Sequence, residues 1–116
     1  MRCLIPLNQK KVVWLGEKIK TPPFSKLARM RAGFLLRCLQ QGLEIEYPLS
    51  RPMPIIGQKC NELRIKDKDH FWRVIYMIDY DAVVILTVFS KKSRKTPLEM
   101  IRRSKQRLNR YRNSIR

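Results

Sequence analysis

Basic side chains suited to binding phosphate groups gather in the second half of the chain. Arg64 and Lys66 stand two residues apart in an alternating segment, so a strand there would place both on one face. Arg73 follows in the next apolar segment, and an antiparallel turn between the two segments would bring it beside that pair. A dense cationic run from Ser90 to Lys95 comes after the last apolar segment. We predict that these residues line one curved face of a sheet that binds RNA.

Cleavage of RNA by its own 2′-hydroxyl uses groups of this kind and requires no metal. The attacking hydroxyl needs a base, the pentacovalent phosphate needs cations, and the departing 5′-oxygen needs an acid. A guanidinium keeps its charge and holds a phosphate through two hydrogen bonds, so Arg64 and Arg73 suit phosphate stabilisation. A lysine among other cations gives up its proton more readily, so lysines of the cationic run could act as base or acid.

These residues also have ordinary structural interpretations. Solvated strands commonly carry Lys and Arg, so the basic face alone does not establish catalysis. Trp72, Tyr76 and Phe89 could stack on bases, but aromatic residues in apolar strands more often belong to the core. His70, in a predicted turn, is more often a surface histidine than a general acid. The charge density of the Ser90–Lys95 run favours contact with a polyanion over a plain turn.

The composition predicts one domain, residues 1–116, with an anionic partner. An apolar content of 44% is enough to build a core. Lys and Arg number 26 against 9 Asp and Glu, and the resulting net charge of +17 attracts nucleic acid, an acidic protein or an anionic membrane surface alike. No apolar run approaches the roughly 20 residues that span a bilayer, and the start lacks a signal-peptide pattern. We therefore expect a cytoplasmic protein with no membrane association.

The cysteine and histidine content does not predict a metal centre. Cys3, Cys38 and Cys60 are far apart, form no CxxC pair and share the chain with one histidine. An odd number of cysteines in a reducing compartment favours free thiols. We expect no metal and no other cofactor.

Two helices and a strand meander must position the basic residues. Strand and turn signals predict strands over residues 11–15, 61–66, 72–78 and 82–89, with the last one central and buried on both faces. The proline-rich segment 47–57 is predicted to be a connector without regular structure. The fold class is thus α+β, a small antiparallel or mixed sheet of about four strands. An N-terminal helix (or helical hairpin) and a C-terminal helix pack against it.

The helix ends are marked by capping residues. Ser25 is a plausible N-cap and Gly42 a plausible end for a helix over 26–41, in which Gly33 is expected to allow a close packing contact. Thr96 and Glu99 are expected to form a capping box for the last helix. The core face of the first helix is expected to contain Leu27, Met30, Ala32, Phe34, Leu35, Cys38 and Leu39, with its arginines largely opposite.

Five short segments occur in one order along residues 11–110: Ala32-Gly33-Phe34-Leu35-Leu36 with Gln41-Gly42, Pro52-Met53-Pro54-Ile55-Ile56-Gly57, Glu62-Leu63-Arg64-Ile65, Arg73-Val74-Ile75-Tyr76, and Phe89 to Pro97. Together they resemble the HigB-like, phage-related branch of the RelE/ParE toxin superfamily. The resemblance implies a RelE-like fold. It also implies the toxin of a type II toxin–antitoxin system, a ribosome-dependent mRNA endonuclease that inhibits translation.

The same resemblance implies roles for single residues. Arg64 and Arg73 would stabilise the scissile phosphate, whereas the cationic run would contact RNA or move protons through Lys91, Lys92 and Arg94. Further contacts to RNA would come from Lys66, Lys95 and Arg102. Pro97 and Leu98 stand where related toxins often carry a tyrosine, so the general acid and base stay unassigned.

The implied partners are the ribosome, mRNA and an antitoxin protein with a helix-turn-helix domain. Two other functions are compatible with the sequence. One is a ParE-like toxin that inhibits DNA gyrase, and the other is an RNA-binding protein without catalysis. A protein that blocks gyrase has no need of a phosphate-binding face, so the basic residues favour RNA cleavage.

Overall fold

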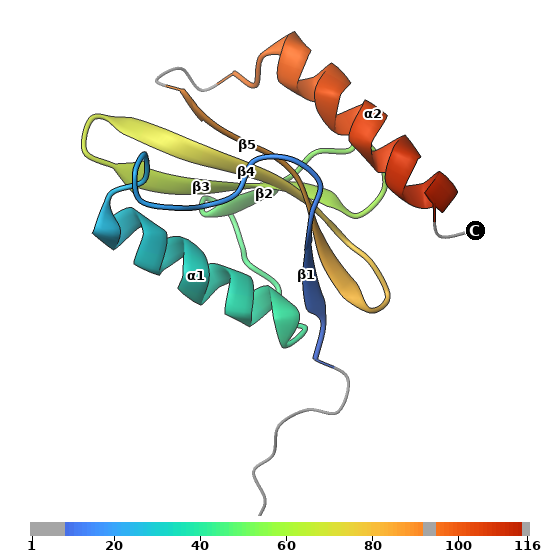
Figure 1. The fold of residues 1–116 in the computed structure, drawn as a ribbon, viewed down its shortest axis with the longest axis horizontal. Helices are drawn as coiled ribbons and strands as arrows, with labels where there is room; N and C mark the ends of the chain where they lie inside the picture. The colour runs from blue at the N-terminus through green and yellow to red at the C-terminus, as the bar shows by residue number, and fades with distance from the viewer. Residues whose placement is uncertain (1–8, 92–94, 115–116) are drawn as a thin grey trace, which may run out of the picture.

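A five-stranded mixed sheet with one helix on each face forms the protein (Figure 1). The computed structural model describes residues 9–91 and 95–114. The elements are β1 (Lys11–Trp14), α1 (Lys26–Gln40), β2 (Ser50–Pro52), β3 (Cys60–Asp67), β4 (His70–Ile78), β5 (Ala82–Lys91) and α2 (Leu98–Ser114). The predicted α+β class is confirmed, and the arrangement is compatible with a RelE-like fold.

The strand order is β1-β5-β4-β3-β2, with β1 parallel to β5 and all other neighbours antiparallel. The predicted meander corresponds to β3, β4 and β5. The prediction of an irregular connector was wrong at β2, which pairs with β3 and adds a fifth strand. Its Pro52 is tolerated because β2 is an edge strand, where a missing N–H disturbs no further ladder. Before the sheet meander there is one helix, α1, rather than a helical hairpin.

Two core layers lie on the two faces of the sheet, because alternate residues of a strand point to opposite faces. The α1 layer is built from residues such as Ala32, Leu36, Leu63 and Val74. The α2 layer includes Ile75, Met77, Val84, Leu86 and Leu108. The strand β5 lies between β1 and β4 and is buried from Ala82 to Val88, as its continuous apolar run predicts; the central position of the sheet is taken by β4.

The ends of α1 follow the predicted chemistry. The Ser25 hydroxyl accepts a hydrogen bond from the Ala28 backbone N–H at 3.1 Å. After the helix, Gly42 adopts a φ of 86°, a left-handed conformation that favours glycine. The predicted packing role of Gly33 was wrong, because the nearest atom to a Cβ placed there is Nη1 of Arg37, 3.8 Å away.

The predicted core face of α1 was partly wrong. The helix buries Ala28, Ala32, Leu36 and Leu39 against the sheet. Leu27, Met30 and Phe34 are instead more than half exposed. The two alanines let the helix backbone approach the sheet closely, so the buried side is centred on small residues. The larger apolar side chains then point away from the core.

The start of α2 differs from the predicted capping box. The Thr96 hydroxyl donates to a carboxylate oxygen of Glu62 at 2.8 Å. Glu99 forms an ion pair with Arg103 at 3.0 Å, one turn further along the helix. A tertiary contact to the sheet therefore uses the hydroxyl that was predicted to cap the helix.

Candidate nucleic-acid interface

Three rows of cross-strand partners carry the basic residues on the α2 face of the sheet. The rows are Lys66, Phe71 and Lys91; Arg64, Arg73 and Phe89; and Arg51, Glu62, Ile75 and Thr87. Direct partners on antiparallel strands have Cβ atoms about 4.5–5.5 Å apart, so the side chains of a row lie within reach of each other. The structure thus places Arg64 beside Arg73, with Lys66 and Lys91 in the adjacent row. We call these three rows the cationic face.

Glu62 lies at the centre of the cationic face and is fully buried. Its carboxylate accepts hydrogen bonds from Nε of Arg51 at 3.0 Å and from the Thr96 hydroxyl at 2.8 Å. Nη1 of Arg73 lies 3.5 Å from the same carboxylate. One acidic side chain therefore connects β2, β4 and the segment that leads into α2.

Arg73 is also buried, with 1% of its surface exposed. Burial lowers the pKa of Arg73; Glu62 opposes this shift, whereas the charges of Arg64 and Arg51 add to it. The guanidinium groups of Arg51 and Arg73 thus share one carboxylate, and Arg64 adds a third positive charge beside Arg73. The surplus of positive charge at this point is compensated when an anion such as a phosphate binds.

Arg64 is half-buried beside this cluster. Its Cζ lies 5.3 Å from the centroid of the Phe71 ring, in the geometry of a cation–π contact. Its Nε is buried and has no hydrogen-bond acceptor within residues 9–91 and 95–114. The Phe71 ring therefore orients the Arg64 guanidinium, whose buried Nε N–H lacks an acceptor among the described residues.

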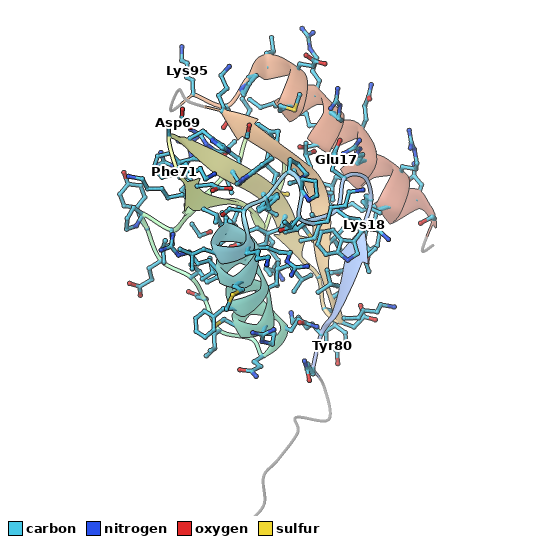
Figure 2. All side chains as sticks on the ribbon, turned by 60° about the vertical axis from the view of Figure 1, so that its left-hand side comes forward. Glu17, Lys18, Asp69, Phe71, Tyr80 and Lys95 are labelled. Atoms are coloured by element: carbon cyan, nitrogen blue, oxygen red, sulfur yellow. The ribbon has the colours of Figure 1, made fainter. Side chains whose placement is uncertain are left out.

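The other predicted residues differ in position. Lys66 is exposed and Lys91 half-buried, on either side of Phe71 in their row. Lys95 is exposed and lies at the same end of the sheet as Asp69 and Phe71 (Figure 2). Arg102 is exposed on the first turns of α2. The predicted residues Lys92 and Arg94 lie outside the described residues, as does Cys3.

The aromatic residues on the opposite face of β4 belong to the core. Trp72 stacks on Phe24 with ring centroids 4.0 Å apart, and its indole N–H donates to Asp67 at 2.8 Å. His70 contacts the edge of the Trp72 ring, away from the cationic face. The hydroxyl groups of Tyr76 and Ser50 are hydrogen-bonded at 2.7 Å. Trp72 and Tyr76 are therefore core residues, as expected for aromatic residues in apolar strands.

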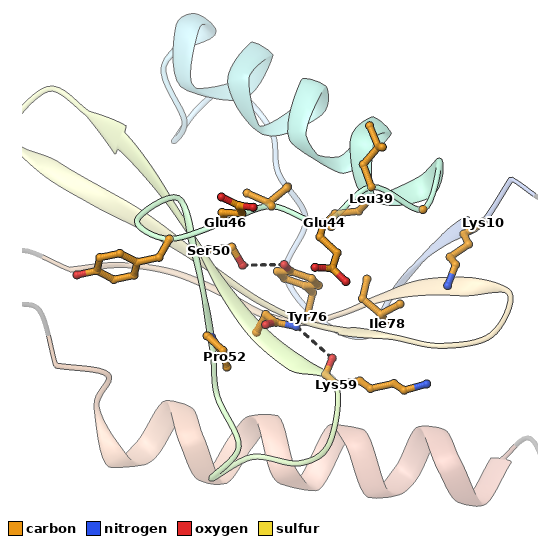
Figure 3. A pocket seen from close by; sticks show the side chains of 14 residues that line it. Lys10, Leu39, Glu44, Glu46, Ser50, Pro52, Lys59, Tyr76 and Ile78 are labelled. Atoms are coloured by element: carbon orange, nitrogen blue, oxygen red, sulfur yellow. Dashed lines mark hydrogen bonds between the residues drawn. The ribbon is translucent and has the colours of Figure 1, made fainter.

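A pocket of about 560 Å³ also opens on the α1 face (Figure 3). Its floor includes Tyr76 and Ile78, and Lys10 and Lys59 contribute to its lining. Because these floor residues belong to the α1 layer of the sheet, the pocket is separate from the cationic face.

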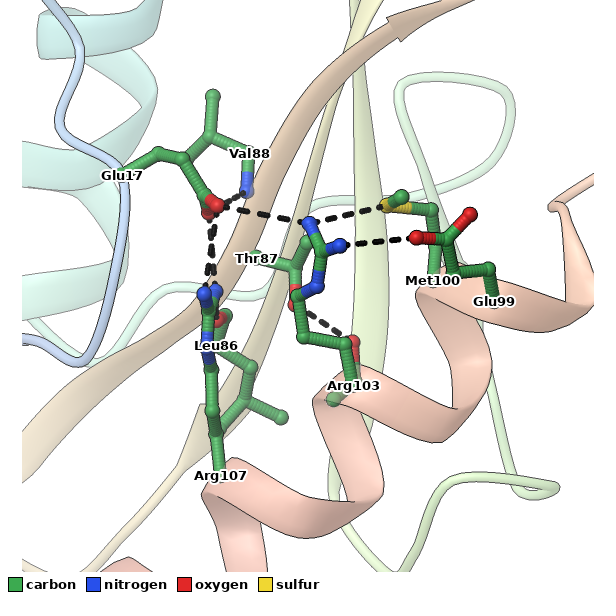
Figure 4. A network of polar contacts seen from close by, with 9 residues as sticks. Glu17, Leu86, Thr87, Val88, Glu99, Met100, Arg103 and Arg107 are labelled. Atoms are coloured by element: carbon green, nitrogen blue, oxygen red, sulfur yellow. Dashed lines mark hydrogen bonds and ion pairs between the residues drawn. The ribbon is translucent and has the colours of Figure 1, made fainter.

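A second polar network fixes α2 on the sheet (Figure 4). The Glu17 carboxylate accepts hydrogen bonds from Nη1 of Arg107 at 2.9 Å and from the Val88 backbone N–H at 3.2 Å. Burial raises the pKa of Glu17, but the hydrogen bond of Arg107, two backbone N–H groups and the charge of Arg107 together outweigh it and leave the pKa below its usual value. Nearby, the hydroxyls of Thr87 and Ser104 lie 2.7 Å apart. These contacts hold α2 in register beside the cationic face.

Arg51 is the component of the site that the sequence did not reveal. It lies in a three-residue edge strand that contains proline and has no alternating pattern. A signal did exist at Glu62, which stands two residues before Arg64 and therefore shares its face in a regular strand. A carboxylate on a basic face implies cationic partners nearby.

Within the described ranges, no three His, Cys, Asp or Glu side chains are grouped as metal ligands would be. The same ranges contain no helix of the length and apolarity required to cross a bilayer. Cys38 and Cys60 are free thiols, and burial raises the pKa of Cys60 to about 11.

Comparison with known proteins gives one family. The family model for "Phage derived protein Gp49-like (DUF891)" matches residues 22–109. The matched range begins before α1, ends within α2 and includes all three rows of the cationic face. Neither the curated proteins nor the solved structures contain a significant match to the chain.

Proposed function

Since the chain belongs to the Gp49-like family of phage-derived proteins, part of the RelE/HigB-like toxin superfamily, we propose that it is a ribosome-dependent mRNA endonuclease. It would be the toxin of a type II toxin–antitoxin system. The observation that carries this proposal is the pairing of Arg51 and Arg73 with the single carboxylate of Glu62, with Arg64 directly beside Arg73. A toxin that cuts RNA needs such a concentration of positive charge at one phosphate.

In the proposed complex, the scissile phosphate lies over Arg64 and between Lys66 and Lys91. Arg64 is oriented by Phe71 and contributes a planar guanidinium, which suits the two-oxygen geometry of a phosphate. Arg73 lies beneath the surface of the cationic face, because its side chain is buried and paired with Glu62. Its charge stabilises the negative phosphate, whereas the sequence had suggested direct contact.

The reaction proceeds by attack of the 2′-hydroxyl on the adjacent phosphorus. A base takes the proton of that hydroxyl, the bond from phosphorus to the 5′-oxygen breaks, and an acid protonates the departing oxygen. The products are a 2′,3′-cyclic phosphate and a 5′-hydroxyl. Lys91 is the described residue best placed to move a proton, with Lys92 and Arg94 as the other residues assigned from the sequence.

The partners of this function are the ribosome, its mRNA and an antitoxin. Lys95 and Arg102 are exposed, so they can contact RNA beyond the scissile phosphate. An antitoxin with a helix-turn-helix domain would keep the toxin inactive.

The test is a purified translation system with one defined mRNA, in which cuts are mapped by primer extension. We expect the unchanged protein to cut the mRNA at codon-spaced positions. Arg64→Gln is expected to slow cutting by about 10²–10³-fold, the usual effect of losing one transition-state donor. Arg110→Gln is the matched control, because Arg110 is exposed near the far end of α2 beside Leu15 and Ser114. Intact mRNA with the unchanged protein, or equal rates for the two variants, contradicts the proposal.

One observation favours a second candidate, an RNA-binding protein without catalysis. Glu62 and Arg73 form a buried ion pair, which many proteins use for structure alone. For this candidate, the same assay gives RNA or ribosome binding that weakens gradually as cations are removed, with no cut in the mRNA.

A further inference from the structure

The outer side of α1 carries three large apolar side chains that no described residue covers. Leu27, Met30 and Phe34 are 57%, 66% and 61% exposed. Their spacing of three and four residues places them in one line along the helix. We call them the outer stripe. Contiguous exposed apolar side chains of this size commonly mark a surface that binds another macromolecule.

The outer stripe is not required for the fold of this chain. α1 already packs on the sheet through its opposite side, which is centred on Ala28, Ala32 and Leu36. The two helices lie on opposite faces of the sheet (Figure 1), so the outer stripe is separate from the cationic face. A ligand on the outer stripe therefore does not compete for the residues that would bind RNA.

The charged residues of α1 itself are all positive. α1 contains four basic residues and no acidic one; the basic residues, all exposed, are Lys26, Arg29, Arg31 and Arg37. None of them forms an ion pair with any residue that the structure describes. At 100° per residue, Arg31 flanks the stripe on one side, and Lys26 and Arg37 flank it on the other.

In α2, by contrast, some basic side chains form ion pairs within the chain. Arg103 of α2 pairs with Glu99 at 3.0 Å, and Arg107 pairs with Glu17 at 2.9 Å. The chain thus neutralises part of the charge of α2 with its own carboxylates. The charges beside the outer stripe have no such compensation among the described residues, so an acidic ligand fits them.

We propose that the outer stripe is a docking site for an acidic amphipathic helix of a partner protein. Apolar side chains of that helix, repeated every three or four residues, pack on Met30 and Phe34. Its Asp and Glu residues form ion pairs with Lys26, Arg31 and Arg37. This inference goes beyond the proposed function, because it requires no RNA cleavage.

Other occupants fit the surface less well. A second copy of the chain would bring two helices with four uncompensated positive charges each against one another. An interfacial membrane helix needs a broad apolar face, whereas α1 keeps only a narrow stripe outside its own core. RNA fits less well than an apolar helix, because Leu27 and Met30 offer it neither a charge nor a ring on which a base could stack.

The test uses three labelled peptides of about 20 residues and the full chain, with binding measured by fluorescence anisotropy. The first peptide has leucines at helical spacing flanked by glutamates. The second has the same composition with its leucines scattered around the helix, and the third has lysine in place of every glutamate. We expect binding of the first peptide only.

Variants of the chain locate the binding. Phe34→Ser and Met30→Ser are each expected to weaken binding of the first peptide by about tenfold or more, as is usual for the apolar centre of an interface. Tyr80→Ser is the matched control, because Tyr80 is 94% exposed in the turn between β4 and β5. It is expected to change binding by less than about twofold. Thermal melting checks that the three variants remain folded.

Several results overturn the proposal. Equal binding of the scattered-leucine peptide means that only net charge acts, and an equal effect of Tyr80→Ser means that the outer stripe is not the site. Sedimentation that shows a dimer lost in Phe34→Ser identifies a second copy as the occupant. Binding to phosphatidylglycerol vesicles that Phe34→Ser abolishes, without peptide binding, identifies a membrane surface. None of these results depends on mRNA cleavage, so failure here is distinguishable from failure of the proposed function.

Discussion

The buried pair of Glu62 and Arg73 makes a strong prediction about stability. The two side chains are 0% and 1% exposed, and their charged atoms lie 3.5 Å apart. We consider three variants: Glu62→Leu, Arg73→Met and the double variant. Glu62→Leu removes the carboxylate beside the buried Arg73, whereas Arg73→Met leaves Glu62 bonded to Arg51 and Thr96. The double variant replaces both buried charges by apolar side chains.

The expected magnitudes follow from this burial. Removal of one partner of a buried ion pair costs about 3–5 kcal/mol, so Glu62→Leu should lower Tm by roughly 10–20 °C. Arg73→Met should cost less, because Arg51 and Thr96 still bond to Glu62. The double variant should lie within about 1–2 kcal/mol of the unchanged protein, because an apolar pair of similar volume needs no desolvation of charge. Arg51 and Thr96 also lose Glu62, but both are partly exposed and can bond to water instead.

Urea denaturation of the four proteins gives the coupling energy of the pair. We expect the two single effects to exceed the double effect by about 3 kcal/mol or more. The control cycle uses Glu99 and Arg103, an ion pair one helical turn apart with substantial exposure, for which about 0.3–0.5 kcal/mol is expected. Additive single effects at Glu62 and Arg73 would refute the claim that these two charges stabilise one another.

Further predictions concern the space around two glycine residues and the pH dependence of stability. Gly16→Ala places a Cβ in overlap with the Arg107 guanidinium and should destabilise the protein by about 1–2 kcal/mol in urea denaturation, because the contacts of that side chain to the sheet are lost. Gly33→Ala, in an open helical position, should instead stabilise it by about 0.5–1 kcal/mol; the opposite order contradicts the described packing. The backbone N–H of Ser25 donates to Asp67 and lowers the pKa of that carboxyl. Its contribution to stability is therefore present above the unfolded pKa of about 4 and is lost as the pH falls through the lower folded value. Thermal melts between about pH 5 and pH 2 should show a smaller acid loss for Asp67→Asn; an unchanged loss contradicts the assignment.

The cationic face was predictable because it depends on strand parity and a short turn. Arg64 and Lys66 share a face in any regular strand, and the two-residue turn at Lys68 and Asp69 fixes Arg73 as the partner of Arg64. The burial of Arg73 was not predictable. It depends on Glu62 being held by groups from distant parts of the chain, including an edge strand too short to leave a pattern.

The side of α1 that packs on the sheet could not be predicted from the sequence either. Apolar residues occur around most of this helix, so periodicity alone leaves its core side undetermined. Packing against the sheet selects the side with Ala28 and Ala32, because small side chains permit the closest approach of the helix. The outer stripe is the consequence of that selection.

Analysis of the RNA ends tests the central claim most directly. Purified ribosomes carrying one defined mRNA are treated with the protein, and the ends at each cut are identified chemically. The account predicts 2′,3′-cyclic phosphate and 5′-hydroxyl ends, and no cut where the attacking 2′-hydroxyl is replaced by hydrogen. Intact mRNA, 5′-phosphate ends, or cleavage that persists in the 2′-deoxy substrate would contradict it.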